Sequence, residues 1–188
     1  PYLASEFGAS GLEVGLLMTI YSLMQFFFSP IWGRWSDRIG RRPIILISLF
    51  GASIAHLGFA FSSSLWVLFL ARGFAGIFGA NISVATAYIA DVTDKKDRSK
   101  SMGIIGVAFG LGFILGPAIG GLLADISSDF GSGPPFGTGF PALGASLICF
   151  LNMIFAYFKL PESLKEGERN TGRVVPSRFK QIFRFSLK

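Results

Sequence analysis

Five long stretches of this chain are almost free of charge, and they constrain its fold more than any other feature. They run over 11–32, 43–61, 65–89, 102–124 and 140–158. Each is long enough for an apolar helix of about 20 residues, the length that crosses the hydrocarbon core of a bilayer. Charged residues make up 15% of the chain, against about 25% in an ordinary soluble domain. The sequence therefore predicts an all-α polytopic membrane protein, with five spanning helices bundled over 1–164.

The basic residues are segregated to one side of this predicted bundle. Every Lys and Arg except Arg72 lies in the turn 33–42, in the loop 94–100 or after residue 158. The loops expected on the opposite side, 1–10, 62–64 and 125–138, contain none. Cytoplasmic loops of membrane proteins are enriched in Lys and Arg, so we expect the N-terminus of this chain outside and its C-terminus in the cytoplasm. The basic residues behind the net charge of +6 then lie along the membrane surface and not on one binding patch, so no nucleic-acid partner is expected.

The turn 33–42 carries four arginines and one acid, Asp37, between two apolar runs. One interpretation is charge that only sets the topology, with Asp37 as a local partner. The other is a gate, in which an acid pairs with arginines in one conformation and releases them in another. Charge alone leaves the two interpretations equally supported.

Arg72 is the one fixed charge well inside a predicted span. An arginine within hydrocarbon costs at least about 2.5 kcal/mol, so it is expected to face protein or water. Arg72 shares a helical face with Gly76 and Gly79, whose small size lets another helix approach closely. The alternative is that Arg72 reaches outward to the membrane surface, which lies about two turns away.

The fourth apolar stretch has glycines at every fourth position and a proline that is expected to bend the helix. The pattern is G-x-x-x-G-P-x-x-G-G, formed by Gly112, Gly116, Pro117, Gly120 and Gly121. Glycines at this spacing form a flat face that favours tight helix packing. The spacing of glycines alone is common, whereas the complete pattern is more specific.

These motifs together resemble the major facilitator superfamily, and within it the drug/proton antiporters of the tetracycline/proton branch. The pattern G-x-x-x-D-R-x-G-R-R of 33–42, the R-x-x-x-G of Arg72 and the glycine pattern carry the resemblance, and 87–94 and 160–163 extend it. It implies the N-terminal bundle of such a transporter, helices two to six, with the first helix and the C-terminal half outside this chain. It also implies proton-coupled efflux of an amphipathic compound by alternating access, across a bacterial inner membrane.

The resemblance also implies roles for individual residues. Arg72 would couple transport to protons, and the glycine pattern would be the antiporter motif. The cytoplasmic latch would be formed by Gly33, Asp37, Arg38, Gly40, Arg41 and Asp91, with Arg41 as the expected partner of Asp91. A solute/proton symporter or facilitator of the same fold is the nearest alternative, and a membrane scaffold without transport is another.

The sequence departs from this branch midway along the second span, where Ala55 and His56 stand in place of an aspartate and an aromatic residue. Tetracycline is therefore not assumed as the substrate. His56 could carry a proton near neutral pH, or it could be a neutral hydrogen-bonded ring. The polar residues considered for substrate contact are Tyr21, Gln25 and Asn81, which interhelical hydrogen bonds would explain equally well.

Several classes of function are not expected from this sequence. With one His and one Cys, it has no catalytic triad, no paired-carboxylate site and no metal-ligand spacing. We expect no enzyme activity, no cofactor and no metal, and Cys149 is expected to be a small packing residue. The segment 165–188 is interpreted as a basic cytoplasmic linker, in which Phe179, Ile182 and Phe183 could share a helical face on the membrane surface.

Overall fold

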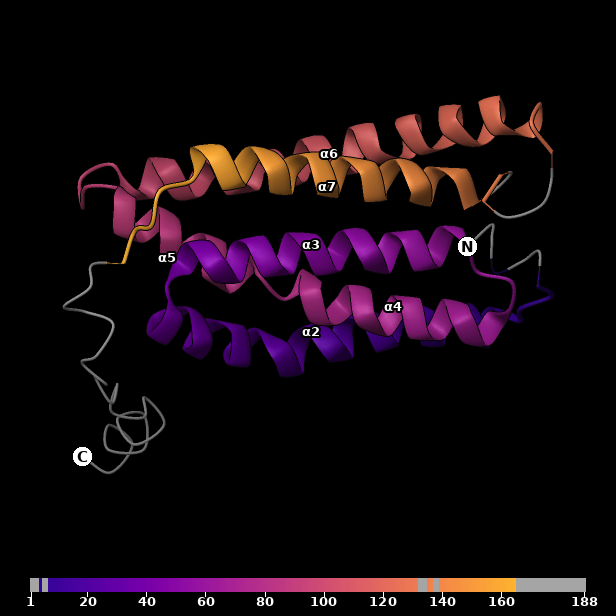
Figure 1. Cartoon of the computed structure of the whole chain (residues 1–188), viewed down its shortest axis with the longest axis horizontal. Coiled ribbons are helices and arrows are strands. Elements are labelled where there is room, and N and C mark those ends of the chain that lie inside the picture. The colour runs from indigo at the N-terminus through magenta and orange to yellow at the C-terminus, as the bar shows by residue number, and fades with distance from the viewer. Residues whose placement is uncertain (1–3, 5–6, 132–134, 137–138, 165–188) are drawn as a thin grey trace, which may run out of the picture.

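The computed structural model describes Ala4 and residues 7–131, 135–136 and 139–164, and all of its regular elements are helices (Figure 1). The tail 165–188 and its predicted interfacial helix lie outside the described residues. Five described segments are long and apolar enough to cross a membrane, as predicted. The helices are α2 (Gly11–Ile39), α3 (Arg41–Ala60), α4 (Leu65–Gly79), α5 (Ile82–Val92), α6 (Arg98–Ser128) and α7 (Phe140–Lys159).

The helices form an antiparallel bundle in which α3 lies between α7 and the pair α2 and α4 (Figure 1). The α2–α3 turn, the α5–α6 loop and the end of α7 meet at one end of the bundle (Figure 1). We call this the basic end, because the turn 33–42 and the loop 94–100 hold eight of the basic residues. The charge segregation in the sequence is therefore a segregation in space as well.

The helix α2 is longer than the apolar stretch predicted it to be. It begins with a capping box, in which the Glu13 amide donates to Ser10 Oγ at 3.4 Å and the Ser10 amide donates to Glu13 Oε2 at 2.7 Å. It then continues past Pro30 to Ile39. The predicted turn 33–42 is therefore helical except at Gly40. Hydropathy locates where a helix leaves the hydrocarbon, but a charged segment beyond that boundary can remain helical in water.

The third span is divided into two helices, where the sequence predicted a single one. Helix α4 ends at Gly79, α5 begins at Ile82, and Ala80 and Asn81 form a turn between them. The carbonyl groups at this break are bonded by side chains of α2: Gln25 Nε2 donates to Gly79 O at 3.0 Å and Trp32 Nε1 to Ile77 O at 2.7 Å. These bonds allow the break, because the last carbonyls of a helix have no partner within it.

Helices α2 and α4 pack with almost no space between their backbones at Gly76. A Cβ atom built on Gly76 would lie 2.5 Å from the carbonyl oxygen of Tyr21 and 2.9 Å from Cβ of Met24. Glycine is therefore required here for close approach of the two helices, as the sequence pattern around Arg72 predicted.

We expect Gly76→Ala to destabilise the bundle, because the new methyl group meets backbone that cannot move aside. Overpacking of this kind costs about 1–3 kcal/mol. The matched control is Gly103→Ala in α6, where a Cβ would meet nothing within 4 Å. Thermal unfolding in detergent micelles measures both variants. Equal unfolding temperatures for the two variants would contradict the packing described at Gly76.

Helices α3 and α7 are joined in their interior by two serines. Ser53 Oγ donates to Ser146 O at 2.9 Å, and Ser146 Oγ donates to Ser53 O at 2.8 Å. At the end of the bundle opposite the basic end, a Cβ atom built on Gly139 would lie 2.7 Å from the carbonyl oxygen of Ala60. Reciprocal hydrogen bonds between small residues allow two helices to approach closely in a membrane. The pair therefore forms one packed unit along most of its length.

Candidate functional site

Arg41 is the centre of an ion-pair cluster at the basic end. Its side chain is 11% exposed and lies at the start of α3. The guanidinium contacts Asp37 Oδ1 at 2.6 Å through Nη1 and Asp91 Oδ2 at 3.1 Å through Nε. Nη1 also donates to Ser36 Oγ at 2.6 Å. One arginine therefore joins the ends of α2, α3 and α5, and the pairing of Arg41 with Asp91 expected from the sequence is present.

A third acid, Glu162, completes this cluster from the segment after α7. Its carboxylate accepts the backbone amides of Arg41 at 2.9 Å and of Arg42 at 3.3 Å. A carboxylate at a helix N-terminus bonds otherwise unpaired amides and interacts favourably with the helix dipole. Ser163 Oγ donates to Asp91 Oδ2 at 3.2 Å. Sequence reasoning did not assign Glu162 or Ser36 to the cluster. Glu162 is distant from Arg41 in the sequence, and Ser36 stands at a position where the motif allows any residue.

The two glycines that the motif places in this cluster have different structural roles. Gly40 has φ 122°, and a Cβ there would overlap the Glu162 carboxylate. Gly33 lies within α2, and a Cβ there would meet nothing within 4 Å. The close approach of Glu162 to the start of α3 therefore requires glycine at position 40.

We expect Gly40→Ala to lower the stability of the bundle and to displace Glu162, whereas Gly33→Ala is tolerated by the fold. Backbone strain at a positive φ costs about 1–3 kcal/mol, and displacement of Glu162 adds the loss of two hydrogen bonds. Unfolding temperature in detergent and the yield of folded protein measure the difference. A Gly40→Ala variant as stable as Gly33→Ala would show that this contact does not matter.

The backbone amide of Arg42 donates to Glu162, but the side chains of Arg38 and Arg42 take no part in the ion pairs of Arg41. Arg38 is exposed and forms no ion pair with any described residue. Arg42 instead contacts α7, where Nη2 donates to Tyr157 O at 2.6 Å and the guanidinium lies 5.3 Å from the centre of the Tyr157 ring. The four arginines of the motif are therefore not equivalent, and Arg41 makes the ion pairs.

Arg72 lies against α2. Its guanidinium is 4.8 Å from the centre of the Tyr21 ring, and Nη2 lies 3.4 Å from Met18 Sδ. A cation over an aromatic face is favourable by about 0.5–2 kcal/mol. The side chain is half-buried, and its guanidinium forms no ion pair with an acid among the described residues. The Arg72 side chain thus points to the neighbouring helix α2, where the Tyr21 ring contacts its guanidinium.

His56 lies on α3 and is bonded within its own helix. Its Nδ1 lies 2.7 Å from Ala52 O, and because a carbonyl can only accept, Nδ1 carries the proton. Among the described residues, the ring forms no hydrogen bond with Arg72, the other residue expected to take part in proton coupling. This bond is compatible with both interpretations of His56, because a neutral ring and a charged ring can each donate from Nδ1.

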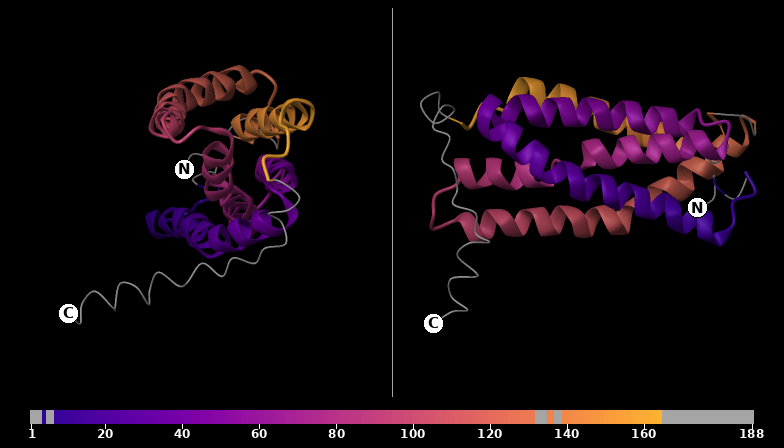
Figure 2. Two further views of the ribbon diagram at one scale, coloured as in Figure 1. Left: turned by 90° about the vertical axis from the view of Figure 1, so that its left-hand side faces the viewer. Right: turned by 90° about the horizontal axis from the view of Figure 1, so that it is seen from below.

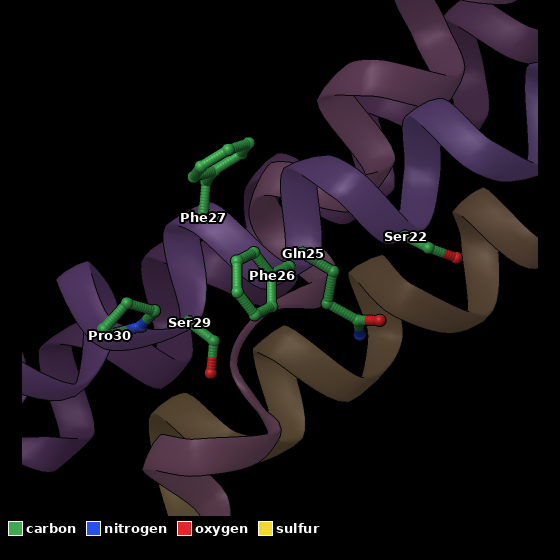
Figure 3. A pocket seen from close by; sticks show the side chains of 6 residues that line it. All are labelled: Ser22, Gln25, Phe26, Phe27, Ser29 and Pro30. Atoms are coloured by element: carbon green, nitrogen blue, oxygen red, sulfur yellow. The ribbon is translucent and has the colours of Figure 1, made fainter.

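An open pocket of about 560 Å³ lies along α2, within the usual size range of ligand pockets. Figure 3 shows two serines, Gln25 and two phenylalanines along one helix, so that the lining combines aromatic and polar groups. The six lining residues are Ser22, Gln25, Phe26, Phe27, Ser29 and Pro30. Asn81 is not among them, and its amide donates to Ser48 Oγ at 2.8 Å. Of the three residues considered for substrate contact, Gln25 is the one at this pocket.

The glycine pattern of α6 packs against nothing within the described part of the chain. A Cβ built on Gly112, Gly116, Gly120 or Gly121 would meet no atom within 4 Å. The helix continues through Pro117 and changes direction part-way along (Figure 2), which agrees with the bend expected from this residue. The tight packing expected from the glycines is therefore not made by these helices.

A model of the major facilitator superfamily matches residues 1–187. The chain belongs to this superfamily. It is accordingly an integral membrane protein of a family of transporters, with the five apolar helices as its membrane part.

The tetracycline resistance proteins of class H from Pasteurella multocida and of class B from Escherichia coli are 42% and 44% identical to it, over 82% of this chain and 38% of each relative. Multidrug resistance protein 1 of Bacillus subtilis is 35% identical, over 97% of this chain and 45% of that protein. This superfamily member thus spans less than half the length of these relatives.

A solved structure shows the same arrangement of helices. The crystal structure of the human organic anion transporter MFSD10 (TETRAN) matches 89% of this chain and 38% of that protein, with a TM-score of 0.72 and 31% identity. The resemblance inferred from the motifs is therefore confirmed at the level of family and fold.

Proposed function

We propose that this chain is most of the N-terminal half of a transporter that exports an amphipathic, drug-like compound in exchange for protons by alternating access. Its first helix and C-terminal half would belong to the same transporter. The basic end would face the cytoplasm of a bacterium, because Lys and Arg concentrate on that side of a membrane. The segment 165–188 would be a cytoplasmic linker between the halves.

The cluster around Arg41 is the observation that carries this proposal. It joins three helix ends through ion pairs whose acids are accessible: the Asp37 side chain is 62% exposed and that of Asp91 is 30% exposed. Such pairs can form in one conformation and separate in another at a moderate free-energy cost. Asp37, Arg41 and Asp91 would thus be the closed latch of one state, with Gly40 and Glu162 positioning Arg41.

Two further observations support export of a drug-like compound. The pocket on α2 combines aromatic rings with Ser22, Gln25 and Ser29, which suits an amphipathic ligand. The relatives carry the names of tetracycline and multidrug resistance proteins. Arg72 would be the coupling residue, and the open glycine face of α6 would pack against a segment outside the described residues.

The test is drug-driven proton release in everted membrane vesicles that contain the full-length transporter. The vesicles are acidified inside, a panel of amphipathic drugs is added, and the lumenal pH is followed. We expect drug addition to release protons from the lumen, because export in an everted vesicle moves the drug inward. No proton release with any compound in the panel would reject the proposal for those compounds. Uptake coupled to inward proton flow in whole cells would favour the symporter alternative.

A further inference from the structure

We propose that Gln25 is a positioning residue that links occupancy of the α2 pocket to the break between α4 and α5. A ligand with a hydrogen-bond acceptor would draw the Gln25 amide away from Gly79 O and release α5, which carries Asp91 of the latch. This inference rests on the proposed function, because it concerns the ligand of the same transporter.

Gln25 belongs to both structures at once. Its side chain lines the pocket (Figure 3), and its Nε2 donates to Gly79 O at 3.0 Å. Gly79 is the last residue of α4, so its carbonyl has no partner within that helix. The amide has two N–H donors, so a ligand competes with this carbonyl when it accepts the N–H that now bonds Gly79 O.

The position of α5 is held by hydrogen bonds at the break and by the burial of Val84 in a cluster with Trp32, Ile44 and Ala80. The turn at Ala80 and Asn81 interrupts the helical hydrogen-bond ladder, so side chains from neighbouring helices hold the two parts in line. One is Trp32, which donates to Ile77 O, and another is Ser48, which accepts from Asn81. A third contact crosses from α5 to the pocket, since Ser83 Oγ donates to the carbonyl of Ser29, a pocket residue, at 3.3 Å.

A movement of α5 would displace Asp91 at its C-terminal end. Asp91 lies in its last turn and pairs with Arg41 at 3.1 Å. A ligand can shift a two-state equilibrium only through contacts that differ between the states. Exchange of Gly79 O for a ligand acceptor at Gln25 is such a contact. A ligand that opens the break therefore has to present a hydrogen-bond acceptor to the Gln25 amide.

The experiment measures the position of the α5 end in the full-length transporter in lipid nanodiscs. Spin labels are attached to cysteines at the exposed positions Lys95 and Lys159, in a Cys149→Ser background, and the distance between them is recorded by pulsed electron paramagnetic resonance. The variant is Gln25→Met, which keeps the length of the side chain and removes its donor. The matched control is Ser22→Ala, in the same pocket but without a bond to the break.

Without ligand, we expect Gln25→Met to populate a second distance about three- to tenfold more than the wild type, as for the loss of one hydrogen bond. Ser22→Ala should match the wild type. In the wild type, tetracycline, which is rich in acceptors, should populate this second distance, and tetraphenylphosphonium, which has none, should not. The probe comparison uses wild-type protein, so it decides the matter even if Gln25→Met fails to fold.

Three outcomes would overturn the inference. The first is a ligand-free distance distribution of Gln25→Met that equals that of the wild type. The second is an equal response of the wild type to both probes, since a merely structural Gln25 would not distinguish them. The third is a wild type that responds to neither probe. Failure of the proposed function has a separate signature, which is absence of drug-driven proton release while the Gln25→Met shift persists.

Discussion

Arg72→Ala is expected to abolish drug-driven proton release, reducing it to the level of vesicles without the transporter. The guanidinium lies over the Tyr21 ring and beside Met18 Sδ within the third span. A cation in this position costs at least about 2.5 kcal/mol of free energy against hydrocarbon. A residue with only a packing role would be more stable as an apolar side chain, so loss of transport without loss of folding would identify Arg72 as functional.

Two matched variants separate charge from packing at this position. Arg72→Lys keeps the cation and is expected to keep part of the proton release, because Lys can also lie over an aromatic ring. Tyr21→Leu removes the ring and leaves the charge. We expect it to retain drug binding and to lose part of the coupling. Lumenal pH and equilibrium drug binding are measured on the same preparations. Full proton release by Arg72→Ala would reject the coupling role.

Arg41→Ala is expected to reduce transport at least about fivefold by destabilising the latched conformation. The variant loses two ion pairs and the bond to Ser36, and it leaves Asp37 and Asp91 without their shared cation. Because both acids are accessible, we discount this loss to about 1–3 kcal/mol. A change of that size shifts a two-state equilibrium by about five- to 150-fold.

The measurement for Arg41→Ala combines transport rate with access to the pocket. A cysteine at Ser29 is labelled from the side of the basic end, and its rate reports how often this end is open. We expect faster labelling in Arg41→Ala than in the parent. Arg38→Ala is the matched control, because Arg38 makes no ion pair with the described residues. Equal labelling in the two variants would show that Arg41 does not hold this end closed.

The number of spans could be predicted from the sequence for a physical reason. An apolar run long enough to cross a bilayer indicates directly that the segment lies in hydrocarbon and not in water. The pairing of Arg41 with Asp91 was instead implied by the resemblance to the superfamily, which the motif 33–42 carries. Glu162 was missed because its role depends on where the end of α7 arrives, beside the amides of α3. No local pattern records such a contact.

The break in the third span was missed for a different reason. The stretch is mostly apolar and has no proline at the break, and Gly79 and Asn81 are weak signals for a helix end within a glycine-rich span. The break is stabilised by Gln25 and Trp32 on α2, so it is a property of the packed bundle. The tight packing predicted for Gly112 and Gly116 is absent among the described helices, because sequence alone does not show which neighbour a glycine face meets.

The direction of proton movement driven by a drug gradient alone tests the central claim most directly. The purified full-length transporter is reconstituted into liposomes loaded with a slowly permeating drug that the vesicle assay identifies. The pH is equal on both sides, and the membrane potential is clamped with potassium and valinomycin. Proton/drug exchange predicts that the lumen becomes acidic as the drug leaves, in contrast to protein-free liposomes. An alkaline shift would indicate symport, and an unchanged pH would indicate a facilitator or a scaffold; either result would contradict the account.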